Sequence, residues 1–493
     1  MDEPRERGHG GRPALRAGGA AWTFDDLGDR IASAAGWLAG EGVRRGDVVL
    51  LVVPDSPRWI ALFLALARRG AVVAVASPDL PTDRLRDATQ RLCPSVVVGD
   101  PAASVAGTAR VLPAHAAEEG VDAGLPDPGP APVRRDDVAY LLLTSGSTGP
   151  SKWAVHRAGD IAACCATYGR RVLRLRPDDV TWSVAALPTS YGLGNSCYFP
   201  LAAGASAVVA GADRSPAACA DACALHGVTA LFGVPTSWAR LARHVADGRV
   251  PRAAFSTVRL AVSAGEHLPA EVWRAVERTT GLRLVNGLGS SEASNLYLSD
   301  RPGNPRPGTA GWPVAGYEVR LRAGAADDPG EGELLVRGPT IMRGYLGDDL
   351  AGAAGPSGGW LATGDILRRE ADGSHTYVRR AGDRFKAGAM WVDAQKVRAA
   401  LVEVAGVGEA AVLPVRDGDG LVRVGAAAVA HPGAGEGLAD RIIAGARSRL
   451  RPHEVPRALL VLEALPTTAS GKLDRAALHA LLAERLGGGR AGR

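Results

Sequence analysis

The stretch LLLTSGSTGPSK at residues 141–152 runs from apolar side chains into a loop of glycines and hydroxyls that ends on a lysine. A continuous apolar run before a glycine turn is typical of a buried strand, so we expect a strand to lead directly into this loop. Glycine lets backbone N–H groups approach phosphate oxygens, and Ser145, Ser147 and Thr148 add hydroxyl donors. The spacing is not that of a Walker A loop, because Lys152 has no glycine before it and no Ser or Thr after it. The segment therefore predicts phosphate binding, and an ordinary flexible Ser/Gly turn is the alternative.

Apolar runs alternate with helical stretches on both sides of this loop. Upstream, VVLLVV (48–53), WIALFLALARRG (59–70) and AVVAVA (71–76) follow one another as strand, helix and strand. This rhythm is typical of a mostly parallel sheet with helices on both faces. Apolar runs recur at 138–144, 206–210 and 228–234. We therefore expect an α/β fold whose large N-terminal domain holds two doubly wound sheets.

The pattern changes twice toward the C-terminus. From about residue 303, short alternating strands lie between Gly and Pro turns, which predicts a small β-barrel subdomain at about 303–380. The polar sequence RAGD at 380–383 indicates a hinge, and a new α/β pattern follows it. The expected domains are a large N-terminal domain at 1–380, a small mobile α/β lid domain at 381–485 and a disordered tail at 486–493.

The composition is that of a globular enzyme. The 493 residues exceed what one hydrophobic core can hold, and 46% of them are hydrophobic. No apolar run reaches the length of a membrane span, and the charged, Gly-rich N-terminus has no secretory pattern. We therefore expect a cytoplasmic protein that does not contact a membrane. The net charge of +5 comes without a Lys/Arg-rich block, which argues against nucleic acid as a partner.

Six cysteines are scattered along the chain without a CxxC pair, as is typical of reduced thiols. Cys219, Cys223 and His226 resemble a metal site in composition. Their spacing fits one face of an Ala-rich helix, however, and buried helix packing is the better interpretation.

Lysine is scarce in this chain. Only four of the 57 basic residues are lysines, namely Lys152, Lys386, Lys396 and Lys472. Arginine therefore serves wherever any cation suffices, and a retained lysine is a candidate for chemistry that needs a compact ammonium group. Chance retention is the alternative for Lys396.

Three further segments place single ionisable residues on glycine turns. RLVNGLGSSEAS (283–294) carries Glu292, which could supply the carboxylate that a hydrated Mg²⁺ ion commonly takes; a surface charge is the alternative. In WLATGDI, Asp365 follows a tight turn, where a carboxylate can accept two hydrogen bonds from a ribose diol. In PTTASGKLDR, Lys472 stands on a glycine turn, from which domain motion could carry it into a site.

Each of these motifs is weak alone, and their order along the chain is specific. The six are TSGSTGPSK (144–152), SAGE (263–266), GLGSSE (287–292), ATGD (362–365), RRAGDRFK (379–386) and TTASGK (467–472). In this order they resemble the acyl-adenylate-forming (AMP-binding) superfamily of acyl-CoA synthetases, carrier-protein adenylation domains and luciferases, over nearly the whole chain. The chain looks most like the benzoate/aryl-CoA ligase group, judged by SYGLGNSCYFPLAAGA (190–205), FGVPTSW (232–238), RLAVSAGEHLP (259–269), YLSDRPG (297–303) and KAGAMWV (386–392).

The resemblance implies an AMP-forming ligase that uses ATP, Mg²⁺ and, as co-substrate, CoA. Residues implied to wrap the ATP phosphates are Thr144, Ser145, Gly146, Ser147, Thr148, Gly149 and Lys152. Those implied around the rest of the nucleotide are Gly265, Glu266, Gly287, Leu288, Gly289, Ser290, Ser291, Asp365 and Arg380. The implied catalytic residues are Lys472, which would bridge the substrate oxyanion and the α-phosphate, Glu292, which would assist Mg²⁺, and Thr148.

The resemblance also implies a pocket for a small aromatic acid and a hinge. The pocket residues are Ser190, Tyr191, Gly192, Ala264 and Asn295, and the hinge residues are Gly382 and Asp383. Tyr191 and Asn295 would favour a polar-substituted ring such as a hydroxy- or aminobenzoate.

The chain departs from the group at several positions. Asn295 stands where a histidine is typical, Gly382 where the hinge is usually Asp or Lys, and Trp153 where a small residue follows the loop lysine. Ser151 replaces a proline, and Ala389 replaces a glycine of the thiol-tunnel loop. These departures concern the second substrate and the acceptor, and they leave the adenylation motifs intact.

Four functions therefore stay open. An aryl-CoA ligase is the first, and an enzyme that loads an aryl acid onto an acyl or peptidyl carrier protein is the second. The third activates nitrite with ATP for diazotisation of an arylamine, because Asn295 cannot carry the charge of a carboxylate anchor. The fourth is a non-enzymatic nucleotide-binding scaffold.

Overall fold

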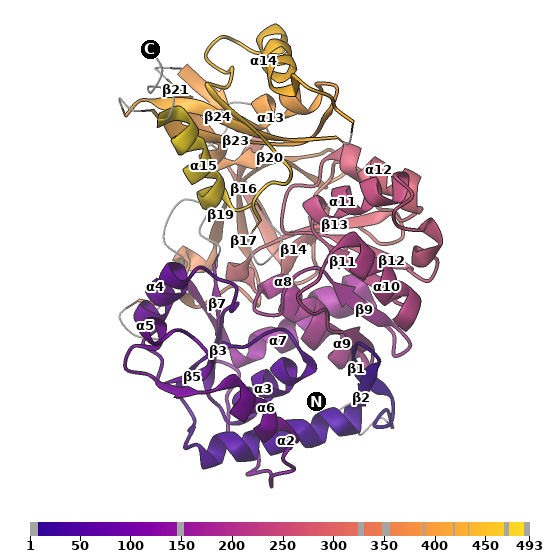
Figure 1. Cartoon of the computed structure of the whole chain (residues 1–493). Helices are drawn as coiled ribbons and strands as arrows, with labels where there is room; N and C mark the ends of the chain where they lie inside the picture. The colour runs from indigo at the N-terminus through magenta and orange to yellow at the C-terminus, as the bar shows by residue number, and fades with distance from the viewer. Residues whose placement is uncertain are drawn as a thin grey trace.

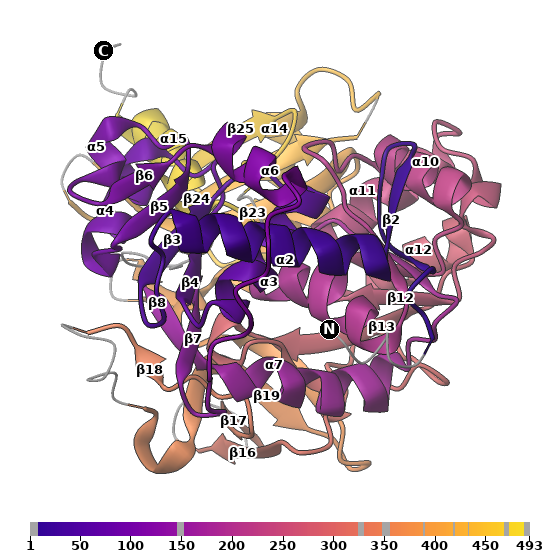
Figure 2. The same ribbon diagram turned by 90° about the horizontal axis from the view of Figure 1, so that it is seen from below.

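Two large, mostly parallel sheets build the N-terminal part of the protein, shown side by side in Figures 1 and 2. The structure is a computed structural model that describes residues 8–144, 152–323, 330–347, 355–387, 390–417, 420–431, 433–467 and 473–487. The predicted site residues that lie outside these ranges are Ser145, Gly146, Ser147, Thr148, Gly149 and Lys472, together with Ser151 and Ala389.

The first sheet has seven strands and includes the strand expected before the glycine loop. Its order is β18-β8-β7-β4-β3-β5-β6, with β3 Val48–Val52, β4 Val72–Val75, β5 Val96–Gly99, β6 Arg110–Leu112, β7 Val138–Leu143, β8 Trp153–Arg157 and β18 Gly344–Tyr345. Its helices are α2 Phe24–Gly40, α3 Pro57–Arg68, α4 Thr82–Leu92, α5 Ala103–Ala106 and α6 Ala114–Asp122.

Strand β3 shows why the strands of this sheet are continuously apolar in sequence. Val49 and Leu51 belong to the core cluster that includes α2 and α3, whereas Leu50 and Val52 belong to the cluster that includes α4. Alternate side chains of a strand point to opposite faces, so both faces of the sheet are buried. The doubly wound arrangement that was predicted is confirmed for this sheet.

The second sheet has nine strands in the order β15-β14-β13-β12-β11-β9-β10-β1-β2. Its strands are β1 Pro13–Ala17, β2 Ala20–Thr23, β9 Val180–Ser183, β10 Ser206–Val208, β11 Ala230–Gly233, β12 Leu260–Ser263, β13 Leu284–Gly289, β14 Leu296–Ser299 and β15 Trp312–Pro313. The associated helices are α7 Ala158–Cys164, η1 Cys165–Leu173, α8 Ser190–Leu193, η2 Gly194–Tyr198, α9 Phe199–Ala203, α10 Pro216–His226, α11 Pro235–Ala246, η3 Arg252–Phe255, α12 Ala270–Thr280 and η4 Ser291–Ala293. Figure 2 shows α10 and α12 on the side of the molecule opposite α4 and α5.

The β-subdomain differs from the expected barrel. Its strands are β16 Glu318–Arg322, β17 Glu331–Arg337, β19 Leu361–Arg369 and β20 His375–Arg380, in the antiparallel order β16-β17-β19-β20, and the short η5 Ser357–Gly359 precedes β19. The edge strands β16 and β20 are not paired with each other, so this sheet is open. Alternating strands between turns do not distinguish an open sheet from a closed one, because closure depends on strand tilt and stagger.

The C-terminal elements form a further α/β unit, drawn in orange and yellow at the top of Figure 1. After η6 Ala381–Asp383 come β21 Arg384–Ala387, β22 Met390–Asp393, α13 Ala394–Val402, β23 Val407–Arg416, β24 Val422–Ala430, α14 Leu438–Arg449, β25 Ala458–Leu462 and α15 Arg475–Gly487. Helices α13 and α14 pack on one face of the sheet β23-β24-β25, and α15 packs on the other. Helix α15 extends two residues into the segment that was expected to be a disordered tail.

The overall α/β class and the two-sheet core agree with the sequence analysis. Cys219 and Cys223 are buried on one face of α10 in the core of the nine-stranded sheet, as the helical spacing predicted. Among the helices of the described ranges, none combines the length and apolar character needed to cross a bilayer.

Gly311 provides a test of how β14 and β15 meet. Its φ is +87°, and a Cβ there would lie 2.0 Å from the carbonyl carbon of Ser299. Gly311→Ala should therefore destabilise the protein by about 3 kcal/mol, through backbone strain and steric overlap. Gly303→Ala is the matched control, because nothing lies within 4 Å of its Cβ. Urea unfolding followed by circular dichroism checks both variants, and equal midpoints would contradict this geometry.

Candidate functional site

The glycine loop is closed at its base by its two flanking residues. The Thr144 amide donates to the Lys152 carbonyl at 2.8 Å, and the Lys152 amide donates to Thr144 Oγ1 at 3.1 Å. Strands β7 and β8, which flank the loop in the sequence, pair with each other in antiparallel fashion. The buried strand predicted before the loop is confirmed, since Leu141 and Leu142 of β7 are in the core.

Lys152 and Glu292 are connected by a residue that the sequence analysis missed. The Lys152 ammonium lies 4.8 Å from the centre of the Tyr345 ring, and the Tyr345 hydroxyl donates to Glu292 Oε1 at 2.7 Å. Burial, and then the Glu292 carboxylate, raise the pKa of Tyr345 above its usual range. Tyr345 lies on the two-residue strand β18, which pairs with β8 directly after the loop. No local pattern marks so short a strand.

His156, also missed, holds the backbone beside Glu292. It is fully buried on β8 and stacks on Tyr140 with ring centroids 5.0 Å apart. Its Nε2 lies 2.8 Å from the Ser291 carbonyl oxygen, and its Nδ1 lies 3.1 Å from Asp160 Oδ2. A carbonyl oxygen can only accept, so Nε2 donates to Ser291.

Arg157 extends this network to the other side of Glu292. Its Nε donates to Asp160 Oδ1 at 3.1 Å, and its Nη2 donates to the carbonyls of Pro339 and Ile341 at 3.2 and 3.0 Å. The next amide, that of Met342, donates to the Glu292 carbonyl at 2.7 Å. The backbone of Glu292, in η4, is therefore bound directly to the segment that leads to Tyr345.

Asp365 and Arg380, predicted to hold the ribose, lie together. They are paired neighbours on β19 and β20, and Arg380 Nε lies 3.4 Å from Asp365 Oδ1. Arg380 also donates to the Thr363 carbonyl at 3.1 Å. Tyr297 is fully buried nearby, and its pKa is raised first by burial and then by the Asp365 carboxylate.

The glycines of GLGSSE are required for the packing of two strands, apart from any role in ligand binding. A Cβ on Gly287 would lie 2.5 Å from the Leu296 side chain, and one on Gly289 would lie 2.4 Å from the Asn295 carbonyl oxygen. These glycines therefore allow β13 and β14 to approach closely. Leu288 is partly buried between them, and Ser290 and Ser291 follow at the start of η4.

Glu266 accepts hydrogen bonds from two residues of the described ranges. It follows Gly265, whose φ of +90° allows the chain to turn after β12. Its Oε2 accepts from the Thr236 amide at 3.2 Å and from the Thr236 hydroxyl at 2.8 Å, and its Oε1 accepts from the Leu473 amide at 3.3 Å. A place for Glu266 beside the adenine stays a prediction.

Of the predicted pocket residues, Tyr191 and Ala264 lie at the C-terminal ends of β11 and β12. Tyr191 Oη lies 3.4 Å from the carbonyl oxygens of both Gly233 and Val262, and Ala264 is fully buried. Ser190 begins α8, where a Cβ on Gly192 would lie 2.0 Å from the Ala186 carbonyl oxygen. Glycine at 192 is therefore required by the fold.

Asn295 is engaged with the protein. Its Nδ2 donates to the Tyr198 hydroxyl at 3.0 Å, and its Oδ1 accepts from the Leu296 amide at 2.8 Å. The second Nδ2 hydrogen of Asn295 has no hydrogen-bond partner in the described part of the chain. Asn295 therefore links Tyr198 to the start of β14.

The predicted hinge residues follow β20 in η6. Asp383 is buried, and its Oδ1 accepts from Arg475 at 2.8 Å while its Oδ2 accepts from Gln395 at 3.3 Å. Trp153, unusual in the sequence, has a structural reason: its buried indole donates to the Ala88 carbonyl at 2.9 Å and anchors α4.

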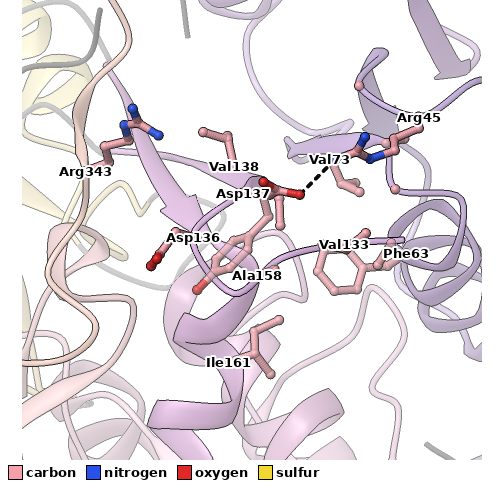
Figure 3. Close-up of a pocket in the computed structure, with 16 residues that line it drawn as sticks. Arg45, Phe63, Val73, Val133, Asp136, Asp137, Val138, Ala158, Ile161 and Arg343 are labelled. Carbon is pink, nitrogen blue, oxygen red and sulfur yellow. Dashed lines mark hydrogen bonds and ion pairs between the residues drawn. The ribbon is translucent and has the colours of Figure 1, made fainter. Parts of the chain in front are cut away.

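Two cavities differ in their relation to these residues. One of about 410 Å³, shown in Figure 3, lies at the N-terminal ends of β4 and β7, where Arg45 pairs with Asp137, and none of its lining residues is a predicted site residue. The other, of about 350 Å³, is lined by Gly233, Thr236 and Thr467. It therefore adjoins Glu266, the Tyr191 hydroxyl and the segment before Lys472.

The chain matches known family models and known enzymes along most of its length. Residues 3–346 match the family model of the AMP-binding enzyme, and residues 396–472 match that of the AMP-binding enzyme C-terminal domain. The p-hydroxybenzoic acid–AMP ligase FadD22 of Mycobacterium tuberculosis is 37% identical over 97% of this chain and 68% of its own length. The 4-hydroxybenzoate–CoA/benzoate–CoA ligase of Rhodopseudomonas palustris is 33% identical over 96% of this chain and 92% of its own length.

Solved structures show the same architecture. A benzoate CoA ligase from Burkholderia xenovorans LB400 has a TM-score of 0.82 at 29% identity, covering 96% of this chain and 98% of that one. The anthranilate CoA ligase AuaEII in complex with anthranoyl-AMP has a TM-score of 0.83 at 26% identity, covering 97% and 96%. Both the large domain and the smaller C-terminal domain are thus represented, and the chain belongs to the AMP-binding enzyme family.

Proposed function

We propose that this enzyme joins an aromatic carboxylic acid of the benzoate class to AMP and then transfers the aroyl group to CoA. The observation that carries the proposal is the identity of 37% and 33%, over nearly the whole chain, to enzymes named for p-hydroxybenzoic acid and for 4-hydroxybenzoate and benzoate. These relatives do not favour carrier-protein loading, nitrite activation or a non-enzymatic scaffold.

Two displacements make up the proposed reaction. A carboxylate oxygen of the acid attacks the α-phosphorus of ATP, the bond to the β-phosphate breaks, and pyrophosphate leaves. The CoA thiolate then attacks the carbonyl carbon, and AMP leaves. Such displacements depend mainly on positioning and on cations directed at developing charge. Lys152 would bind the leaving phosphates, and Lys472 would neutralise charge between the carboxylate and the α-phosphate.

Glu292 is suited to hold Mg²⁺. Its Oε1 accepts from Tyr345, and its Oε2 has no hydrogen bond within the ranges that the structure describes. A hard cation commonly takes one protein carboxylate beside substrate phosphates, and it would offset their negative charge. Asp365 and Arg380 would hold the ribose, and the loop at 144–149 would wrap the phosphates.

The proposed aryl site lies between Tyr191, Ala264 and Asn295. Tyr191, which is partly buried, is neutral there, because burial raises the pKa of this phenol well above its usual range. A neutral hydroxyl and the remaining Asn295 N–H can pair with a hydroxyl or amino substituent on the ring. We therefore propose hydroxy- or amino-substituted benzoates as the preferred substrates.

Pyrophosphate release with a panel of benzoates tests the proposed function. Substituted benzoates should give ATP-dependent pyrophosphate and, with CoA present, a thioester of the matching mass. Pyrophosphate without thioester would leave adenylation standing and exclude CoA as acceptor. Pyrophosphate release that occurs with nitrite and an arylamine, but with none of the aryl acids, would overturn the proposal.

Lys472→Arg tests the need for a compact ammonium group. The larger planar guanidinium should lower the rate of adenylate formation by about 10²-fold or more, and Lys472→Ala by at least as much. Lys396→Arg is the matched control, because Lys396 pairs with Glu454 at 2.7 Å in the C-terminal unit and an arginine can keep that pair. Single-turnover pyrophosphate release measures all three, and near-normal rates for both Lys472 variants would remove the assigned role.

His156→Phe tests the hydrogen-bond network beside Glu292. The ring stack on Tyr140 is kept, but the hydrogen bonds to Ser291 and Asp160 are lost. We expect the KM for magnesium-ATP to rise about tenfold and the KM for the aryl acid to change little, because the backbone at Glu292 is released. His156→Gln keeps a donor and should recover part of the loss. Equal changes in both KM values would indicate a general structural defect.

A further inference from the structure

Three consecutive residues that directly follow Lys472 each contact a different part of the molecule. The Leu473 amide donates to Glu266 Oε1 at 3.3 Å, and Asp474 Oδ1 lies 3.8 Å from Arg84 Nη2. Arg475 Nη2 donates to Asp383 Oδ1 at 2.8 Å. The start of α15 is therefore held at three points, and adjacent Cα atoms are only about 3.8 Å apart.

The first contact is made to a carboxylate that the large domain holds in place. Glu266 Oε2 is bound by the amide and hydroxyl of Thr236, in the first turn of α11. A negative charge is favourable at a helix N-terminus. The other oxygen, Oε1, is thereby aimed at Leu473 from a fixed position.

The second contact is made to an anchored helix. Arg84 lies in the first turn of α4, and one turn further on the Ala88 carbonyl accepts from the buried Trp153 indole. On the other side, Asp474 Oδ1 accepts from the amides of Ala476 and Ala477 at 3.0 Å and so caps α15. Both charges have defined positions, although their partial exposure makes the pair weak.

The third contact lies on the C-terminal side of Gly382, the predicted hinge. Asp383 binds Arg475 of α15 and Gln395 of α13, and all three belong to the C-terminal unit. A displacement about Gly382 would therefore keep this contact. It would break the contacts to Glu266 and Arg84, because these residues belong to the large domain.

We propose that Glu266 and Arg84 are positioning residues for the first chemical step: they hold the start of α15 against the large domain and thereby set where Lys472 can act. This rests on the proposed function, in which Lys472 acts while the adenylate forms and has no part in the attack of the thiol. Glu266 and Arg84 therefore matter for adenylate formation and not for aroyl transfer. The role differs from adenine binding, which the sequence resemblance implied for Glu266.

Glu266→Gln separates these roles. Thr236 and Leu473 face different oxygens of the carboxylate, so in a carboxamide the NH₂ group would face the donors of one of them. We expect the single-turnover rate of adenylate formation to fall about tenfold while the KM for ATP stays within twofold. Aroyl transfer from a preformed aryl adenylate to CoA should also stay within twofold.

Arg84→Met is the second variant, and it keeps the aliphatic stem of an exposed side chain. It should slow adenylate formation about two- to threefold, as expected for a weak ion pair, and leave aroyl transfer unchanged. The matched control is Arg91→Met, because Arg91 lies on the same helix and pairs with Asp87 of that helix. It should change neither step.

The outcomes distinguish this inference from the proposed function. Wild-type protein that releases no pyrophosphate with any benzoate overturns both. Active wild-type protein with unchanged Glu266→Gln and Arg84→Met rates overturns the positioning role alone. A raised KM for ATP in Glu266→Gln, with an unchanged rate at saturation, assigns Glu266 to the nucleotide instead. If a variant loses as much rate in aroyl transfer as in adenylate formation and has a lowered unfolding temperature, Glu266 and Arg84 contribute to general stability and the positioning role is overturned.

Discussion

The hydrogen bond between Tyr140 and Ser294 joins the strand that precedes the glycine loop to the turn that carries Glu292, and so joins the two large sheets. The two oxygens are 2.6 Å apart in the buried core, and Ser294 adopts a left-handed conformation with φ of +60° to reach this position. Tyr140 lies on the strand that leads into the loop of residues 145–151, and Ser294 follows the turn that carries Glu292. Because both ends of this contact are buried, strand β7 and the Glu292 turn keep a defined separation.

Three carboxylates of the site differ in role because their partners differ. Glu292 keeps one oxygen without a described partner and faces Tyr345 with the other. Among the residues that the structure describes, Glu266 binds one of the large domain and one of the C-terminal unit, whereas both partners of Asp383 belong to the C-terminal unit. The arrangement of Glu292 suits cation binding. That of Glu266 suits a contact between domains that can form and break, and that of Asp383 suits a contact that is kept during domain motion.

Much of the fold follows from local patterns. The strand before the glycine loop, the α/β rhythm and the burial of Cys219 and Cys223 were predicted, because periodicity reports which faces are covered. The expected barrel is an open four-stranded sheet, since closure depends on long-range stagger. Tyr345 and His156 were missed because each acts on Glu292 or its neighbour from more than 50 residues away in the chain.

The sequence by itself determined the chemistry of the chain: the order of the glycine motifs, the rarity of lysine and the ionisable residues beside each turn. Only the tertiary structure decided which groups are already engaged. It showed that Asn295 binds Tyr198, that Trp153 anchors α4 and that Glu266 faces Leu473. The reason is physical: a motif specifies a residue's donors and acceptors, but packing between distant elements decides which of them are satisfied within the protein and which remain for a substrate.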